Sequence, residues 1–224
     1  MIFEMQSIGV VQSPFSDKFG IPRQPELVPA AQTIIALNRE FGAESVRGLA
    51  EFDYIWVQFV FHEALSQGWA QMVRPPRLGG KEKKGVFATR SPHRPNHMGL
   101  SLLRLVAVDD TACPIKLICG GSDLLNGTPV LDIKPYLPFV EAQPHAASGF
   151  VQGAPPKLNV IWQTDAFRLP ENTRAIIEQC LAQDPRPAYQ NLPERIYGIQ
   201  VAGTEVKFRI ENQKVFILKI DELN

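Results

Sequence analysis

Short segments of β-forming residues, separated by proline and glycine, fill the first 165 positions of this 224-residue chain. The stretches between these segments hold most of the 19 prolines. Proline lacks a backbone donor, so it is excluded from helix interiors and central strands and marks the connections between elements. Many short strands with turn signals and almost no helix are typical of a closed or nearly closed barrel. We therefore predict a mainly β fold that begins with a small β-barrel domain over residues 1–164.

The segment from Phe52 to Phe61 is the strongest of the predicted strands, because it is rich in aromatic and β-branched residues. The others are Phe3 to Val11, Thr33 to Leu37, Gly99 to Val108, Ile115 to Cys119, Val130 to Ile133 and Asn159 to Thr164. We expect the last of them to return to the barrel sheet. A glycine-rich G-x-G-x-x-G turn after a first strand is missing from the sequence, which argues against a Rossmann nucleotide-binding domain.

Residues 165–224 predict a small α+β C-terminal domain. Pro170 begins a helix that runs to about Asp184. Its apolar face is formed by Ile176, Ile177, Cys180 and Leu181. Val206 to Ile210 and Val215 to Ile220 flank a turn and predict a hairpin. A unit of this size buries little apolar surface, so we expect it to be stable only when it is docked on the barrel.

The stretch from Arg74 to Ser101 concentrates positive charge. It contains seven of the 23 lysines and arginines of a chain with no net charge, and a single acid, Glu82. Its prolines forbid a helix, so its donors would be held in place before an anionic ligand binds. The alternative is a plain solvated surface loop. Val86 to Ala88 lies in the middle and predicts a short buried strand that fixes the residues after it.

The cysteines and the apolar runs indicate the cellular compartment of the protein. Cys113, Cys119 and Cys180 are odd in number and lack the spacing of metal ligands, which predicts a reduced, cytoplasmic protein without a metal site. The most apolar run, Tyr54 to Phe61, is too short to span a membrane. The N-terminus lacks the basic and apolar regions of a signal peptide, so we expect no membrane association.

Three local patterns are candidates for ligand contact. Arg23 and Gln24 lie between Pro22 and Pro25, where a guanidinium and an amide could read a base edge; a plain surface loop explains them equally well. His62 and Glu63 follow the strongest strand. Asp132 lies inside an apolar strand, where a carboxylate needs a partner, and Lys134 or an arginine of the basic stretch could serve.

From these residues alone, a non-catalytic module that binds RNA or a nucleotide leads. A small-molecule enzyme comes second. Composition and spacing identify no sulfonium cofactor.

Several long motifs resemble one known family. They are Arg74-Pro-Pro-Arg-Leu-Gly-Gly, Gly85-Val-Phe-Ala-Thr-Arg-Ser, Arg94-Pro-Asn, Gly99-Leu-Ser, Gly127-Thr-Pro, Asp132-Ile-Lys-Pro-Tyr-Leu-Pro and Gln183-Asp-Pro-Arg-Pro-Ala-Tyr. Together with Pro22-Arg-Gln-Pro they resemble the signature of the TsaA-like (TrmO) family over most of the chain. The resemblance implies a small β-barrel. It also implies methyl transfer from S-adenosylmethionine to N6 of threonylcarbamoyl-adenosine next to the tRNA anticodon.

The resemblance also assigns residues to the cofactor. They are Pro22, Arg23, Gln24, His62, Glu63, Arg90, Leu100, Asp123, Leu124, Leu125 and Asn126. Two positions depart from the usual pattern: Glu63 replaces the common Gln, and Asn126 replaces the common Asp. The second change removes a charge but keeps a hydrogen-bond acceptor.

Roles for the acceptor and for RNA complete the hypothesis. Asn96 and Asp132 are the candidates for holding the adenine amine, which makes them the predicted catalytic residues. The residues predicted to contact nucleic acid are Arg74, Arg77, Lys81, Lys83, Lys84 and Arg94. The partners that the resemblance implies are the tRNA anticodon loop and a second copy of the chain in a homodimer. The non-catalytic RNA- or nucleotide-binding barrel stays the alternative.

Overall fold

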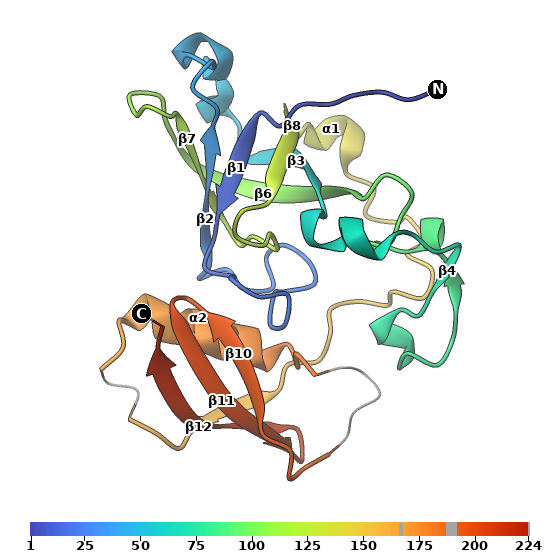
Figure 1. Ribbon diagram of the computed structural model, residues 1–224, viewed down its shortest axis with the longest axis vertical. Coiled ribbons are helices and arrows are strands. Elements are labelled where there is room, and N and C mark those ends of the chain that lie inside the picture. The colour runs from blue at the N-terminus through green and yellow to red at the C-terminus, as the bar shows by residue number, and fades with distance from the viewer. Residues whose placement is uncertain (166–167, 187–191, 224) are drawn as a thin grey trace.

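The computed structural model describes residues 1–165, 168–186 and 192–223, with the side chain of Arg77 also left undescribed. Two bodies lie one above the other (Figure 1). The upper body is a closed six-stranded barrel with the strand order β1-β2-β7-β6-β3-β8. Its strands are β1 (Gly9–Gln12), β2 (Gln32–Leu37), β3 (Tyr54–Val60), β6 (Met98–Asp109), β7 (Lys116–Gly120) and β8 (Pro129–Pro135). The predicted β-barrel is therefore confirmed.

Alternation of buried and partly exposed residues along β3 fixes which side chains enter the barrel. Ile55, Val57 and Phe59 are buried, whereas the residues between them face outward. Antiparallel pairing places Ile55 opposite Leu103 and Phe59 opposite Gly99 on β6. The barrel core consists of residues from its own strands and adjoining turns.

Short helices and one small hairpin lie in the connections outside the barrel strands. The helices are η1 (Ala43–Val46), η2 (Leu49–Glu51), η3 (His62–Gln67), η4 (Pro76–Leu78), η5 (Val86–Ala88) and α1 (Pro138–Glu141). The hairpin pairs β4 (Met72–Val73) with β5 (Lys84–Gly85). We call β4, β5 and the residues between them the basic flap.

Two sequence predictions about the barrel need correction. The first strand begins at Gly9 rather than Phe3, whose side chain is exposed. The predicted buried strand over Val86 to Ala88 is wrong: the three residues form the 3₁₀ turn η5, and only Val86 is buried. Val86 donates its backbone N–H to Gln71, and its carbonyl then accepts from Thr89, so the chain turns instead of extending the flap.

The lower body is a four-stranded sheet covered on one face by α2 (Glu171–Ala182). Its order is β10-β11-β12-β9, formed by β10 (Tyr197–Val201), β11 (Thr204–Glu211), β12 (Lys214–Glu222) and β9 (Asn159–Trp162). The predicted helix is confirmed, and its four predicted apolar residues are buried. The predicted hairpin is β11 and β12. Asn212 and Gln213 form its turn, both at positive φ (49° and 59°).

The strand over Asn159–Trp162 does not return to the barrel as predicted. It pairs in parallel with β12, with Val160 opposite Val215. This pairing gives β12 a second neighbour and lets Val160 and Trp162 pack against the lower core. Apolar content alone could not choose between the barrel and this sheet.

The segment over residues 13–31, here called the bridging loop, connects the two bodies (Figure 1). It leaves the barrel after β1, reaches α2 and β10, and returns to β2. Phe15, Val28 and Ala31 from this loop are buried within the lower core. The predicted docking of the small C-terminal unit therefore takes place through a loop of the N-terminal part of the chain.

Candidate functional site

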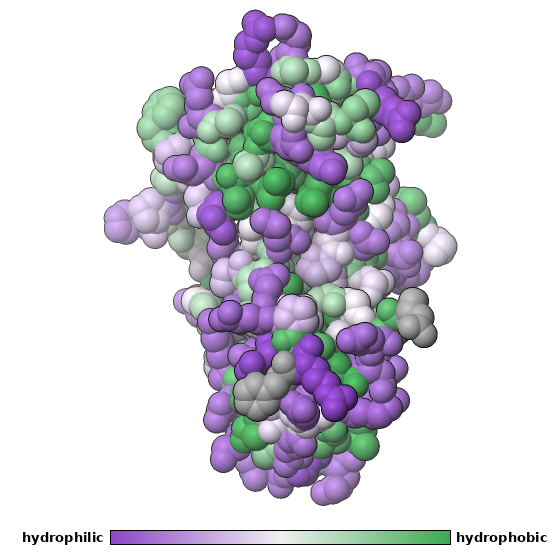
Figure 2. Space-filling view, turned by 90° about the vertical axis from the view of Figure 1, so that its left-hand side faces the viewer, coloured by the Kyte–Doolittle hydropathy of each residue, from purple (hydrophilic) through white to green (hydrophobic). Residues whose placement is uncertain are grey.

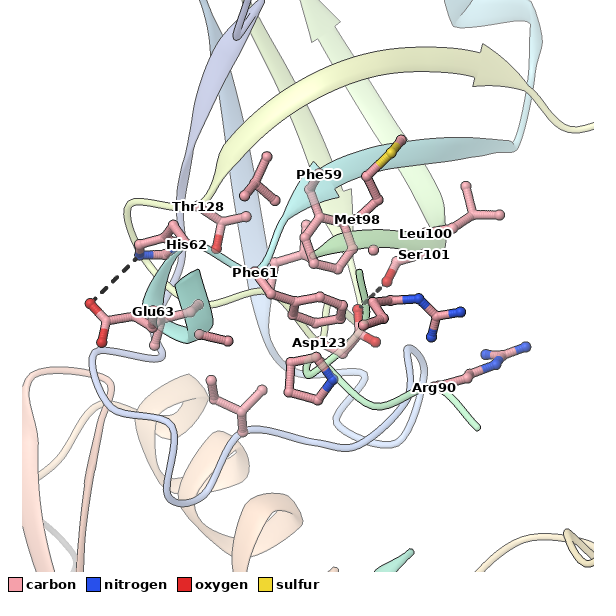
Figure 3. A pocket seen from close by; sticks show the side chains of 18 of the residues that line it. Phe59, Phe61, His62, Glu63, Arg90, Met98, Leu100, Ser101, Asp123 and Thr128 are labelled. Carbon is pink, nitrogen blue, oxygen red and sulfur yellow. Dashed lines mark hydrogen bonds and ion pairs between the residues drawn. The ribbon is translucent and has the colours of Figure 1, made fainter. Parts of the chain in front are cut away.

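A pocket of about 890 Å³ lies where one end of the barrel meets the bridging loop. Residues within 18–24, 56–67, 89–101 and 123–128 line it. These segments are far apart in the sequence, and they meet because β3, the start of β6 and the turn before β8 share one end of the barrel (Figure 3). We call the barrel side of the pocket the strand wall and the side formed by residues 18–24 the loop wall.

Aromatic rings form the strand wall. Phe59 and Phe61 pack edge to face, with ring centroids 5.0 Å apart, and lie at the centre of the view in Figure 3. Gly99 permits this position of Phe59, because a Cβ at residue 99 would lie 2.2 Å from the Phe59 ring. The side chains of Met98 and Leu100 extend the same apolar surface. The wall can stack against a flat, apolar ligand group.

Asp123 places a carboxyl group at this apolar surface. Burial raises its pKa to about 6, although Ser101 opposes the shift by donating a hydrogen bond from Oγ to Oδ1 at 2.7 Å. The charge of Arg90 opposes it as well. The carboxyl group is thus ionised near pH 7, and a cationic ligand group beside it would stabilise the charged form.

The loop wall carries arginine and amide groups. The Gln24 side chain accepts a hydrogen bond from the guanidinium of Arg90 and donates one to the carbonyl of Arg23. Arg94 donates to the carbonyl oxygens of Thr89 and Ser91, at 3.1 and 3.4 Å, which fixes the turn that carries Arg90. These contacts hold the guanidinium of Arg90 against the loop wall, although Arg90 follows a turn and not the strand that the sequence predicted.

Ionisable side chains line the side of the pocket at the end of β3. His62 Nε2 lies 3.9 Å from Glu63 Oε1, and Lys18 Nζ lies 3.5 Å from Glu63 Oε2. Lys18 also donates to the carbonyl oxygen of Glu63 at 2.8 Å. The acid that replaces the usual Gln at position 63 is therefore paired with a base from the bridging loop. This pairing offsets the added negative charge.

The structure brings all but one of the predicted cofactor residues into the pocket. Its lining contains Pro22, Arg23, Gln24, His62, Glu63, Arg90, Leu100, Asp123, Leu124 and Leu125. Asn126 lies outside it, and its Oδ1 accepts the backbone N–H of Ser13 at 3.2 Å. The individual roles of these residues stay predictions.

The predicted catalytic residues do not line the pocket. Asn96 is exposed in the turn before His97. Asp132 is exposed on the outer face of β8, opposite Gln58, which does line the pocket. Among the described residues, no cation forms an ion pair with Asp132, and the side chain of Arg77, one of the arginines of the basic stretch, lies outside the described part. Asp132 Oδ1 accepts the N–H of Ile133 at 2.9 Å, and the side chain is exposed on the outer face of the barrel, where a carboxylate needs no charged partner.

The residues predicted to contact nucleic acid separate into two groups. Arg74, Lys81 and Lys83 are exposed on the basic flap, whereas Lys84 is half-buried and 2.5 Å from Glu82. Arg94 lines the pocket instead of the flap. Arg77 lies in η4, and its side chain is outside the described part.

Sequence reasoning missed the side chains that form the strand wall, including Phe59, Phe61, Ser101 and Gln58. The Gly99-Leu-Ser motif contained the signal for Ser101, since alternation along a strand places residues 99 and 101 on one face. Among the residues described, no group of three or more His, Cys, Asp or Glu side chains could hold a metal ion. Within the same residues, no helix is long and apolar enough to cross a membrane.

Comparison with protein families matches nearly the whole chain. Residues 10–142 match the tRNA-methyltransferase O N-terminal domain, and residues 155–223 match the TrmO C-terminal domain. The chain belongs to the TrmO family. The family motif at residues 183–189 extends into positions 187–189, which lie outside the described residues.

Named relatives and a solved structure agree with this membership. A tRNA (adenine(37)-N6)-methyltransferase of Eikenella corrodens is 58% identical over 74% of this chain and 95% of its own length. A putative S-adenosylmethionine-dependent methyltransferase, RcsF, of Pseudomonas aeruginosa is 44% identical over 92% of both chains. The crystal structure of TrmO from Pseudomonas aeruginosa has a TM-score of 0.81 and 35% identity, covering 99% of this chain and 100% of that one.

Proposed function

We propose that this TrmO-family protein is a tRNA methyltransferase that transfers a methyl group from S-adenosylmethionine to N6 of adenosine 37, in its threonylcarbamoyl form. Family membership supports the reaction, and the single structural observation that supports its location is the pocket. An aromatic wall, a buried carboxyl group and the guanidinium of Arg90 converge there from three separate segments of the chain. The alternative is a non-catalytic RNA- or nucleotide-binding barrel, which needs no such convergence.

The pocket residues fit the chemical groups of S-adenosylmethionine. Phe59 and Phe61 offer apolar faces for an adenosine group. Asp123, ionised near neutral pH, would lie near the cationic part of the cofactor, and Arg90 would meet its carboxylate. When bound, the cofactor supplies the activated methyl group. The residues of the pocket bind and orient it.

Positioning is the main contribution that these residues can make to the rate. The N6 nitrogen is a poor nucleophile because its lone pair is delocalised, so alignment with the methyl group carries much of the catalysis. A hydrogen-bond acceptor must also draw off charge as the new bond forms. Asn96 and Asp132 stay our candidates for holding the amine. Gln58, which pairs with Asp132 across the two strands and lines the pocket, supports an acceptor site at that edge of the barrel.

The basic flap would contact the tRNA backbone. Arg74, Lys81 and Lys83 are exposed on the basic flap, which lies in the chain between the pocket-lining segments 56–67 and 89–101. Their charges would attract phosphates around the anticodon loop mainly by releasing counterions. The acceptor base would then leave its stack to enter the pocket.

A homodimer in the cytoplasm is part of this proposal. Large apolar side chains outside the pocket are exposed on and near the outer face of the barrel, among them Val106, Phe139 and Val140. Figure 2 shows apolar side chains gathered on the barrel half of one face, above a more hydrophilic C-terminal half. Exposed apolar surface of this kind marks interfaces between protein chains. Light scattering would measure the mass, and a monomer at micromolar concentration would contradict the dimer.

Methyl transfer from radiolabelled S-adenosylmethionine to purified tRNA tests the activity directly. Two tRNA samples distinguish the acceptors: one carries threonylcarbamoyl-adenosine at position 37, and the other carries plain adenosine. We expect label only in the modified tRNA. Binding of tRNA with no heat in a cofactor titration at millimolar concentration would favour the non-catalytic module instead.

A further inference from the structure

The bridging loop is anchored at its start to the C-terminal sheet. Phe15 is 1% exposed and lies in the lower core. It forms an isolated β-bridge with Val201, and the carbonyl of Pro14 accepts the N–H of Ala202 at 2.7 Å. The beginning of the loop thus extends the free edge of β10.

The end of the loop is anchored to α2 and to Gln183, the residue that caps its C-terminus. Val28 and Ala31 are fully buried in the same core. The side chain of Gln179 accepts the N–H of Ala30 at 2.9 Å, and that of Gln183 donates to the carbonyl of Leu27 at 3.3 Å. Both ends of the loop are therefore held by residues of the C-terminal domain.

The middle of the loop transmits this support to the pocket. Ile21 packs against the lower core and also lines the pocket. Gly20, at φ +104°, lies close to the side chain of Ile199 on β10, since a Cβ there would be 3.2 Å from it. The next residues along the chain are those of the loop wall, where Gln24 meets Arg90. A single residue, Ile21, thus separates the contact with β10 from the pocket-lining Pro22.

We propose that the C-terminal domain positions the loop wall, through Ile199, Gln179 and Gln183, and thereby sets the affinity for the cofactor. This inference rests on the proposed function, because S-adenosylmethionine is the ligand whose affinity it concerns. A loop that is held in its bound conformation loses less conformational freedom on binding. The three residues are positioning residues, and none of them lines the pocket.

The first test replaces the two glutamines in the full-length protein. Gln179→Ala combined with Gln183→Ala removes two hydrogen bonds to the loop without opening the core. We expect S-adenosylmethionine to bind about 5- to 30-fold more weakly by calorimetry. The KM for the cofactor should rise while kcat at saturating cofactor and the KM for tRNA stay near wild type. Glu178→Ala is the control, since Glu178 on the same helix bonds to Trp162 within the C-terminal domain.

A second test uses the contact of the loop with β10. Ile199→Ala should weaken cofactor binding, and Ile199→Val should restore most of it. Ile217→Ala removes an equally buried isoleucine from β12, a strand separated from β10 by β11, and should leave the affinity unchanged. Thermal melts establish that each variant is folded at the assay temperature. Should Ile199→Ala not fold, the glutamine pair decides the question.

Hydrogen exchange at residues 20–24 gives a readout that needs no ligand. It should be faster in the double glutamine variant than in wild type or Glu178→Ala. Unchanged exchange, unchanged cofactor affinity, or an equal loss in Glu178→Ala would each overturn the proposal. A wild-type protein that binds no S-adenosylmethionine would overturn the proposed function instead, and the exchange experiment would still test the positioning.

Discussion

The two walls of the pocket are supported in different ways. Behind the strand wall lies the barrel core, which is built from the barrel's own strands and turns. The loop wall contains no strand, and the lower core that supports it is completed by Phe15, Val28 and Ala31 of the loop itself. The strand wall therefore depends on strand register, whereas the loop wall depends on the docking of two units. Variants that affect one wall only can test this difference.

Phe15→Ala should have the largest effect on stability, and it should destabilise only the lower body, which supports the loop wall. Truncating a buried phenylalanine costs about 3–5 kcal/mol. Phe15 fills the lower core, so exchange of amides in β10 to β12 should become much faster while that in β2 and β7 stays slow. Site-resolved hydrogen exchange measures both. Equal acceleration in the two sheets would mean that the walls share one cooperative unit.

Gly99→Ala should affect the strand wall. The new methyl group would overlap the Phe59 ring, which must move, and such overpacking costs about 1–3 kcal/mol. Cofactor binding should weaken because the edge-to-face pair with Phe61 is lost. Denaturant unfolding and calorimetry test the two effects. Gly42→Ala is the control for stability, because a Cβ at residue 42 meets no atom within 4 Å and its φ of −93° suits alanine.

Asp123 gives the strand wall a pH dependence that the loop wall lacks. With a pKa of about 6, its carboxyl group is ionised above that pH and neutral below it. Cofactor affinity should therefore fall as the pH is lowered through 6, by up to about tenfold per unit. Ser101→Ala removes a donor to the carboxylate and should shift the midpoint upward. Calorimetry from pH 5 to 8 tests this, and Asp123→Asn should abolish the dependence.

The raised pKa of Asp123 affects folding stability in the opposite direction: stability falls, whereas cofactor affinity rises, as the pH increases. Because the folded state holds this proton more tightly than the unfolded state, whose carboxyl group titrates near 3.8, ionising Asp123 costs stability as the pH rises from about 4 to 6. Asp123→Asn should remove this contribution. Unfolding free energies of both proteins at pH 4.5 and 7 measure it.

Substitutions in the basic flap should have the smallest effect, because the flap belongs to neither wall of the pocket. Replacing Lys81 and Lys83 by Ala should reduce the log–log salt slope of tRNA binding by roughly 1.4–1.8 in total and leave cofactor affinity unchanged. Lys84→Ala should change the slope less, because Lys84 is paired with Glu82. Filter binding across a salt series measures the slopes. An unchanged slope in the double variant would make the flap a plain solvated surface.

The sequence predicted the local elements well where a single segment carries its own pattern. The aromatic and β-branched residues of Phe52 to Phe61 predict β3, and the helical spacing of Ile176, Ile177, Cys180 and Leu181 predicts α2. Of the residues that the family resemblance assigned to the cofactor, all except Asn126 line the pocket. Motifs could do so because they record residue identities that a shared site requires, whether or not local structure explains them.

Pairing and packing were decided only by the tertiary structure. Asn159–Trp162 has the composition of a strand, yet β12 and not the barrel offered it a partner. Val86 to Ala88 is apolar, yet its backbone forms a turn. The N–H of Val86 donates to the carbonyl of Gln71, and the carbonyl of Val86 accepts the N–H of Thr89. The bridging loop shows the same limit. Its prolines predicted a connection between elements, but hydrophobic burial is non-directional, so only the fold could assign Phe15 to a core nearly 200 residues away along the chain.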